Sequence, residues 1–122
     1  MADKDEHLKQ AHHNEEFLEY LRENISIYAD WYTICIYYTA LHYIEAYLDI
    51  LFQHPTNNFE RDRDIKQYLD KPTRTKFRLL KDVSENARYN IINITVEEIY
   101  KEFEPALEFV KNNINELINS HK

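Results

Sequence analysis

Three polar side chains capable of acid–base chemistry interrupt a long apolar segment between residues 28 and 52. His42, Glu45 and Asp49 are spaced by three and then four residues, so a helix places all three on one flank. Carboxylate metal bundles repeat a Glu-x-x-His motif on two helices, whereas here the order is reversed and no second copy occurs. We therefore predict no metal site and interpret the three as a polar seam, with His42 hydrogen-bonded to Glu45 or to a tyrosine.

A second group of residues is suited to an anionic ligand. Residues 61 to 88 contain nine Lys or Arg against five acids, a local excess of about four positive charges in a chain of net charge -7. Arg binds phosphate through two parallel hydrogen bonds, and a loop His can exchange a proton near neutral pH. The predicted ligand-binding set is His54, Arg61, Arg88, Tyr89, His42 and Glu45. Surface ion pairs with nearby acids, or a solvated helix face, are the alternative interpretations.

The composition argues against most catalytic machinery. The chain has no Gly, and this excludes Walker loops and Rossmann turns, whose backbone needs that residue. Its one cysteine, Cys35, lies in the apolar segment and is expected to be a buried core residue rather than a nucleophile. A single cysteine also favours a reducing, cytoplasmic location. We predict no catalytic residue and no cofactor, and a binding protein rather than an enzyme.

The elements that would position these residues are all helical. Thr95 and Glu98 form a capping box, and Pro105 should bend or split the helix that follows. Asn24 or Ser26 is expected to cap the apolar helix. Apolar residues recur at helical spacing in five segments, at about 3–24, 28–53, 58–70, 74–89 and 95–119. The prediction is one all-α domain over residues 1–122, an antiparallel up-and-down bundle of four to five helices.

The apolar segment also carries a prediction about assembly. It is apolar on nearly every side, so neighbouring helices must bury it all round. One face holds large aromatic and aliphatic residues that four short helices would not fully cover: Trp31, Ile34, Tyr38, Leu41, Leu48 and Phe52. We predict a two-fold homodimer, and the alternative is that the tyrosines serve an intramolecular core. The acidic residues and His42 within this segment argue against a membrane span.

Several motifs, taken in order, resemble a known family. Asp30-Trp31 and the run from Tyr37 to Ala46 resemble the central helix of HEPN domains (higher eukaryote and prokaryote nucleotide-binding). His54-Pro55 followed by Arg61, and the later Ala87-Arg88-Tyr89, resemble the segments that follow in that family. The resemblance covers about residues 8 to 118 and implies an antiparallel helical bundle that is commonly a homodimer. Family members include ribonuclease toxins, RNA-processing modules of defence systems, and non-catalytic proteins that work beside nucleotidyltransferases.

The chain departs from the ribonuclease members of that family. Those members carry an Arg followed four to six residues later by His, whereas no His follows Arg88 here until His121. From the resemblance and the basic segment together, we predict a non-catalytic HEPN-like homodimer that binds a nucleotide, RNA or protein partner through a groove near Arg61 and Arg88. One alternative is a divergent, metal-independent ribonuclease of the toxin or defence type, using His54 or His42. Another is a structural or antitoxin-like partner of a nucleotidyltransferase.

Overall fold

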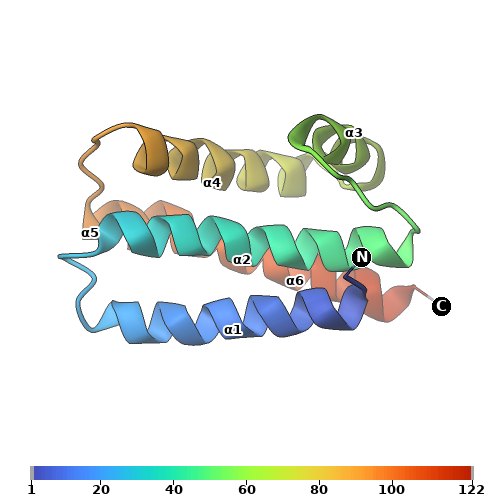
Figure 1. Cartoon of the computed structure of the whole chain (residues 1–122), viewed down its shortest axis with the longest axis horizontal. Coiled ribbons are helices and arrows are strands. Elements are labelled where there is room, and N and C mark those ends of the chain that lie inside the picture. Colours follow the sequence, from blue (N-terminus) through green and yellow to red (C-terminus); the bar gives the residue numbers. More distant parts are fainter. Residues whose placement is uncertain (1, 122) are drawn as a thin grey trace.

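The computed structural model describes residues 2–121, and these residues form helices and loops without a strand (Figure 1). Four long helices run antiparallel: α1 (Lys4–Arg22), α2 (Ala29–Ile50), α4 (Lys71–Tyr89) and α6 (Glu104–Ser120). A short helix, α3 (Asn58–Tyr68), lies across the end of the bundle where α4 begins. The chain enters α6 through α5 (Val96–Glu98) and one π-helical segment, η1 (Ile99–Phe103). The predicted all-α antiparallel bundle is confirmed.

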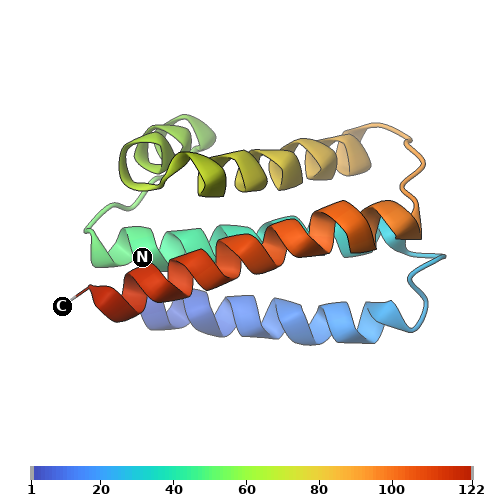
Figure 2. The ribbon, with the colours of Figure 1, turned by 180° about the vertical axis from the view of Figure 1, so that it is seen from behind.

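Helix α2 is the central member of the bundle. It packs against α1, α4 and α6, and Figure 2 shows α6 covering the side of α2 that faces away in Figure 1. Its inward side chains are among the largest that the fold buries completely: Tyr32, Tyr43, Ile36, Ile44 and Leu48. Burying a large aliphatic side chain stabilises a fold by about 1.5–3 kcal/mol, so α2 contributes much of the core. No described helix is both long enough and apolar enough to cross a membrane.

Capping side chains set several of the helix ends. Thr95 forms the predicted capping box with Glu98, and Asn57 caps α3 by accepting a hydrogen bond from the backbone of Glu60. Helix α2 begins after Tyr28 without a side-chain cap, so the expected cap at Asn24 or Ser26 is wrong. The π-helical segment ends at Phe103, two residues before Pro105, so the helical hydrogen bonding changes just ahead of this proline, and α6 then continues through it.

Helix α4 begins at Lys71, three residues earlier than expected. Pro72 does not end the preceding helix but occupies the first turn of α4, where its missing N–H is not needed. Asp70 supplies the cap, because its Oδ1 accepts a hydrogen bond from the backbone N–H of Thr73 at 2.9 Å. Asn113 of α6 also donates to Asp70 at 3.3 Å. Hydrogen bonds from Thr73, followed in importance by the one from Asn113, hold the pKa of Asp70 below its usual value.

Replacing Asp70 by Ala should lower the free energy of unfolding by about 1 kcal/mol at pH 7, the usual value of a helix cap. Because the pKa of the folded carboxyl is lowered, Asp70 stabilises the fold above its ordinary pKa of 3.8. That contribution disappears as the pH falls through the lower folded value. Urea unfolding between pH 7 and pH 2 should show the difference between the two proteins narrowing as the pH falls below 3.8. Asp82→Ala, at an exposed position of the same helix, is the control, and a gap that persists in acid would contradict the assignment.

Candidate functional site

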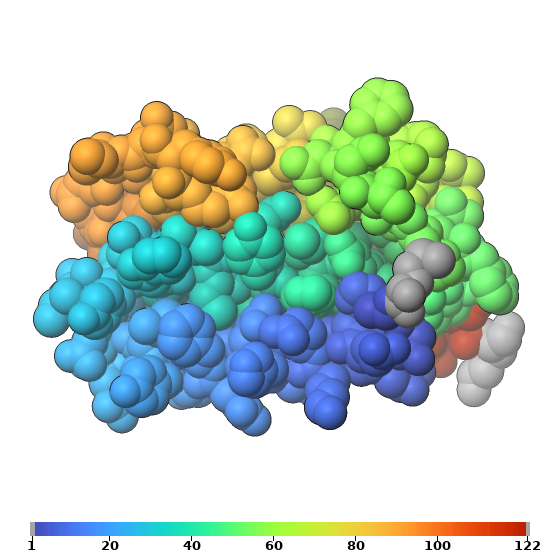
Figure 3. All heavy atoms as spheres, in the orientation of Figure 1, coloured from blue at the N-terminus to red at the C-terminus, as the bar shows by residue number. Residues whose placement is uncertain are grey.

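The outward flank of α2 changes character along the helix. Its first half presents the aromatic side chains of Trp31 and Tyr38 to solvent. Its second half presents half-buried polar residues, His42, Glu45 and Asp49. The space-filling view in Figure 3 shows α2 side chains reaching the surface between those of α1 and those of α3 and α4. The polar residues at i, i+3 and i+7 therefore share one flank, as predicted.

A histidine from α1 completes the cluster around His42 and Glu45. The Nδ1 atom of His7 lies 3.1 Å from Nδ1 of His42 and 3.5 Å from Oε2 of Glu45. Burial lowers the pKa of His42; Glu45 acts in the opposite direction, and the neighbouring His7 and Arg61 lower the pKa further. His7 was not among the predicted site residues. One sequence signal was available: His7 lies four residues before Ala11, so both are on the same face of α1, and Ala11 is fully buried.

Asp49 ties the start of α1 and the loop after α2 to this end of the bundle. Its Oδ2 accepts a hydrogen bond from the backbone N–H of Lys4 at 2.7 Å, and its Oδ1 lies 2.7 Å from Nε2 of His54. Desolvation raises the pKa of Asp49, but the hydrogen bonds with His54 and Lys4 outweigh it, so the pKa is lowered. His54, one of the predicted ligand-binding residues, is therefore engaged by a carboxylate of its own chain.

Arg61 and Arg88, the two arginines of the predicted groove, also have internal partners. Arg61 donates from Nε to Oε1 of Glu45 at 3.1 Å and from Nη1 to Asn58 at 2.7 Å, and its Nη2 forms an ion pair with the same Glu45 oxygen at 3.0 Å. Arg88 donates to the hydroxyl of Tyr38, and its guanidinium lies 5.4 Å from the ring centre of the exposed Tyr89. These contacts hold α3 and α4 against α2. Arg61 thus forms an ion pair, but with a carboxylate of α2 rather than with its neighbours in sequence.

The two arginines do lie near a common residue. Burial raises the pKa of Tyr37, and the positive charges of Arg61 and Arg88 both act against that rise. The Arg88 guanidinium is 5.6 Å from the centre of the Tyr37 ring. Tyr37 itself is buried, so its ring forms part of the wall between the two arginines and the core.

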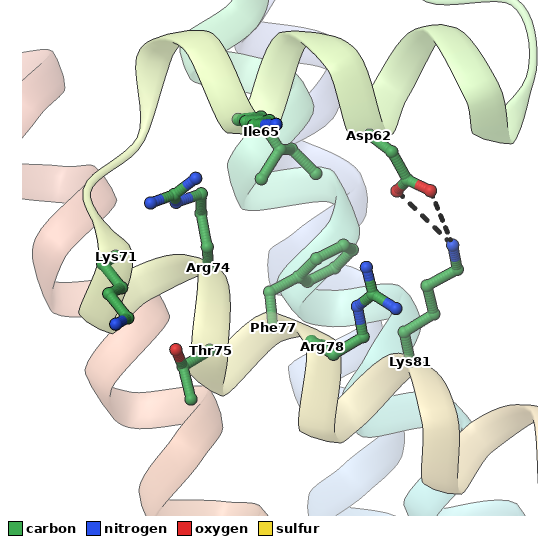
Figure 4. Close-up of a pocket in the computed structure, with 9 residues that line it drawn as sticks. Asp62, Ile65, Lys71, Arg74, Thr75, Phe77, Arg78 and Lys81 are labelled. Carbon is green, nitrogen blue, oxygen red and sulfur yellow. Dashed lines mark hydrogen bonds and ion pairs between the residues drawn. The ribbon is translucent and has the colours of Figure 1, made fainter.

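A separate hollow lies on the other side of α3, between α3 and α4 (Figure 4). Its volume is about 470 Å³, within the range typical of small-molecule sites. Ile65 and Phe77 are buried and provide its apolar wall, while Arg74, Arg78 and Lys81 extend from α4 toward α3. We call this hollow the basic pocket; its lining residues are Asp62, Ile65, Lys66, Lys71, Arg74, Thr75, Phe77, Arg78 and Lys81.

The charges that line the basic pocket are not balanced. It has five cationic side chains and one carboxylate, Asp62, which pairs with Lys81 at 3.2 Å. Within residues 2–121, no carboxylate lies at ion-pair distance from the other four cations, Lys66, Lys71, Arg74 and Arg78. The Nε of Arg74 is buried and has no hydrogen-bond partner. Because this atom is already removed from solvent, a phosphate in the pocket would meet the terminal Nη groups of Arg74 rather than its Nε.

The residues of the basic pocket were inside the basic segment noted in the sequence but were not singled out there. A usable signal exists, because the cations of α4 recur at spacings of three, four and three residues: Lys71, Arg74, Arg78 and Lys81. Such spacing places them on one face of a helix. Ordinary surface lysines and arginines show similar patterns, and only the packing of α3 across α4 turns this face into a hollow.

Cys35 occupies the buried position that was predicted. Burial raises the pKa of its thiol to about 11, so little thiolate forms at neutral pH. The chain as a whole matches no protein-family model, no curated protein and no solved structure. Its resemblance to HEPN domains consequently stays a prediction, and the geometry described above is the basis for proposing a function.

Proposed function

We propose that this chain is a non-catalytic binding module that holds the phosphate groups of a nucleotide or an RNA in the basic pocket. The observation that carries the proposal is the set of four pocket cations, Lys66, Lys71, Arg74 and Arg78, that form no ion pair with a carboxylate of residues 2–121. Charge-assisted hydrogen bonds to phosphate are among the stronger polar contacts available to a protein. The ligand would supply the negative charge that the pocket lacks.

The types of side chain in the pocket favour phosphate over a neutral ligand. Arg74 and Arg78 offer planar guanidinium groups that can each hold two phosphate oxygens, and Lys66 and Lys71 add compact charges. The aromatic ring of Phe77 is buried at the wall and presents little surface for stacking on a base. Recognition would therefore depend on phosphate charge more than on base identity.

The same residues support binding without chemistry. None of the nine lining residues is a His or a Cys, so the pocket offers no side chain that ordinarily exchanges protons near neutral pH. In this proposal Arg61 and Arg88 have a positioning role. Each already has internal partners, and Arg61 anchors α3, the helix that forms one wall of the pocket.

Titration calorimetry at about 50 mM salt tests the proposal, using ATP, a short unstructured RNA, and adenosine, which has no phosphate. We expect heat with ATP or the RNA, none with adenosine, and an affinity that falls as salt is raised. The RNA recovered afterwards should be intact on a denaturing gel, because the module is proposed to be non-catalytic. Absence of binding by both phosphorylated ligands would contradict the proposal, and cleavage of the RNA would favour the ribonuclease alternative.

The homodimer is the second part of the proposal. Phe17, Trp31 and Tyr38 are exposed side by side around a hollow of about 280 Å³ between α1 and α2. A face that carries both aromatic projections and a hollow suits a second copy of the same chain, because a two-fold axis pairs each projection with the partner's hollow. Aromatic side chains are enriched in such interfaces.

Light scattering coupled to size-exclusion chromatography should give a mass near twice the 14.9 kDa of one chain. Trp31→Glu should yield a monomer, since it would bury a charge in the aromatic contact. Ile91→Glu is the matched control, because Ile91 is exposed outside this face and its replacement should leave the dimer intact. A wild-type protein that stays monomeric at high concentration would rule out this assembly.

A further inference from the structure

The cluster of His7, His42 and Glu45 takes no part in the proposed phosphate binding, yet its atoms converge on one point. The three ligand atoms lie within 4.8 Å of one another, with 3.1 Å between the two Nδ1 atoms and 3.5 Å from His7 to Glu45. Around a tetrahedral Zn²⁺, bonds of about 2.0–2.2 Å place neighbouring ligand atoms roughly 3.3–3.5 Å apart. Two of the three separations are therefore close to those of ligands that share one ion, and the third, between His42 and Glu45, is at most 4.8 Å.

A simple hydrogen bond between the two imidazoles accounts for only part of this arrangement. It requires two facing nitrogens, one with a proton and one without. The cluster adds a third donor atom, Oε2 of Glu45, which approaches the same nitrogen of His7. Two imidazole nitrogens and one carboxylate oxygen form a donor set that suits Zn²⁺ and related transition metals rather than Mg²⁺ or Ca²⁺.

The surroundings fix the donors and leave room for one more ligand. Arg61 donates a hydrogen bond from Nε to Oε1 of Glu45, and its Nη2 lies at ion-pair distance from the same oxygen, so Oε2 is left facing Nδ1 of His7. His7 and Glu45 also line a hollow of about 150 Å³ that includes Gln53 and His54. This space is sufficient for a few water molecules, at about 30 Å³ each. A metal bound here would have three protein ligands and one position open to water.

We propose that His7, His42 and Glu45 form a binding site for a divalent transition metal, with Zn²⁺ as the ion that best fits the donor atoms and their spacing. The sequence argued against a metal site because His42 and Glu45 form a single pair with no second copy on another helix. In the structure the third ligand is His7 of α1. Since the ligands lie on two helices, a bound ion would join the first turns of α1 to the second half of α2. This proposal is independent of phosphate binding.

Metal binding can be measured on the full chain after treatment with EDTA and dialysis. Calorimetry with ZnCl₂ should give one ion per chain, and a hundredfold excess of Zn²⁺ over its Kd should raise the thermal midpoint by about 10 °C. Co²⁺ should give the intense visible absorption of a tetrahedral or five-coordinate site. Because no other component is added, failure of this test would leave the phosphate proposal unaffected.

Substitutions distinguish this site from adventitious binding. His7→Asn and Glu45→Gln should each weaken Zn²⁺ binding at least tenfold and abolish the Co²⁺ absorption. His13→Asn, at an exposed position of the same helix, is the matched control and should change neither. Circular dichroism without metal establishes whether each variant is folded. If Glu45→Gln does not fold, the test rests on His7→Asn alone. Absence of Zn²⁺ binding by the wild type, or equal binding by folded His7→Asn, would overturn the proposal.

Discussion

Replacing Arg74 and Arg78 together by Glu should weaken the binding of ATP or RNA by at least about 100-fold. A hydrogen bond to a charged group is worth about 1.5–3 kcal/mol, so losing two such contacts costs about 3 kcal/mol or more. Each 1.4 kcal/mol corresponds to about a tenfold change in affinity. The new carboxylates would also repel the phosphate, in a pocket whose one native acid is already paired with Lys81.

A control with the same change in net charge separates the pocket from the overall field of the protein. Lys9 and Lys76 are exposed and do not line the basic pocket, and Lys76 lies on the same helix as Arg74 and Arg78. The double variant Lys9→Glu, Lys76→Glu should retain most of the affinity. Calorimetry and circular dichroism on both double variants give the comparison. An equal loss in the two proteins would show that general charge, and not the pocket, governs binding.

Replacing Ile36 by Ala should lower the free energy of unfolding by about 3 kcal/mol, within the range of about 2–5 kcal/mol for such core truncations. Ile36 is completely buried in α2, the helix that packs against the other three long helices, so the cavity left behind cannot easily collapse. Small domains have a total stability of about 5–15 kcal/mol, and the loss would be a large part of it. Urea denaturation of both proteins measures the difference.

Ile91→Ala is the matched control for this substitution. Ile91 is fully exposed in the loop before α5, and its truncation should change the stability by less than about 0.5 kcal/mol. Similar losses at the two positions would contradict the placement of α2 at the centre of the core. A small loss at both would mean that the core is packed less closely around α2 than the buried side chains indicate.

The architecture was predictable because it follows from local patterns. A segment that is apolar on nearly every side, from Tyr28 to Phe52, needs neighbouring helices to bury it, and the structure packs it against α1, α4 and α6. The Thr95–Glu98 capping box sets a helix start that depends on residues three apart. The start of α4 was the main local error: the helix begins at Lys71 rather than at residue 74, because Pro72 fits the first turn of a helix.

The site was less predictable because its contacts join distant parts of the chain. His7 contacts His42 only because α1 packs antiparallel on α2. Arg61 pairs with Glu45, rather than with acids closer in sequence, because α3 lies across the end of the bundle. The cations of the basic pocket formed a recognisable helical face in the sequence. Whether their charges would be balanced by acids of another helix depended on tertiary packing, which the spacing does not encode.

The most direct test of phosphate binding by the basic pocket is an NMR titration of the ¹⁵N-labelled protein with ATP, followed at backbone amides. The proposal predicts that the largest shifts fall on the two pocket walls, residues 62–66 of α3 and 71–81 of α4. Shifts that cluster instead around His42 or Trp31, with the amides of both pocket walls unmoved, would contradict it.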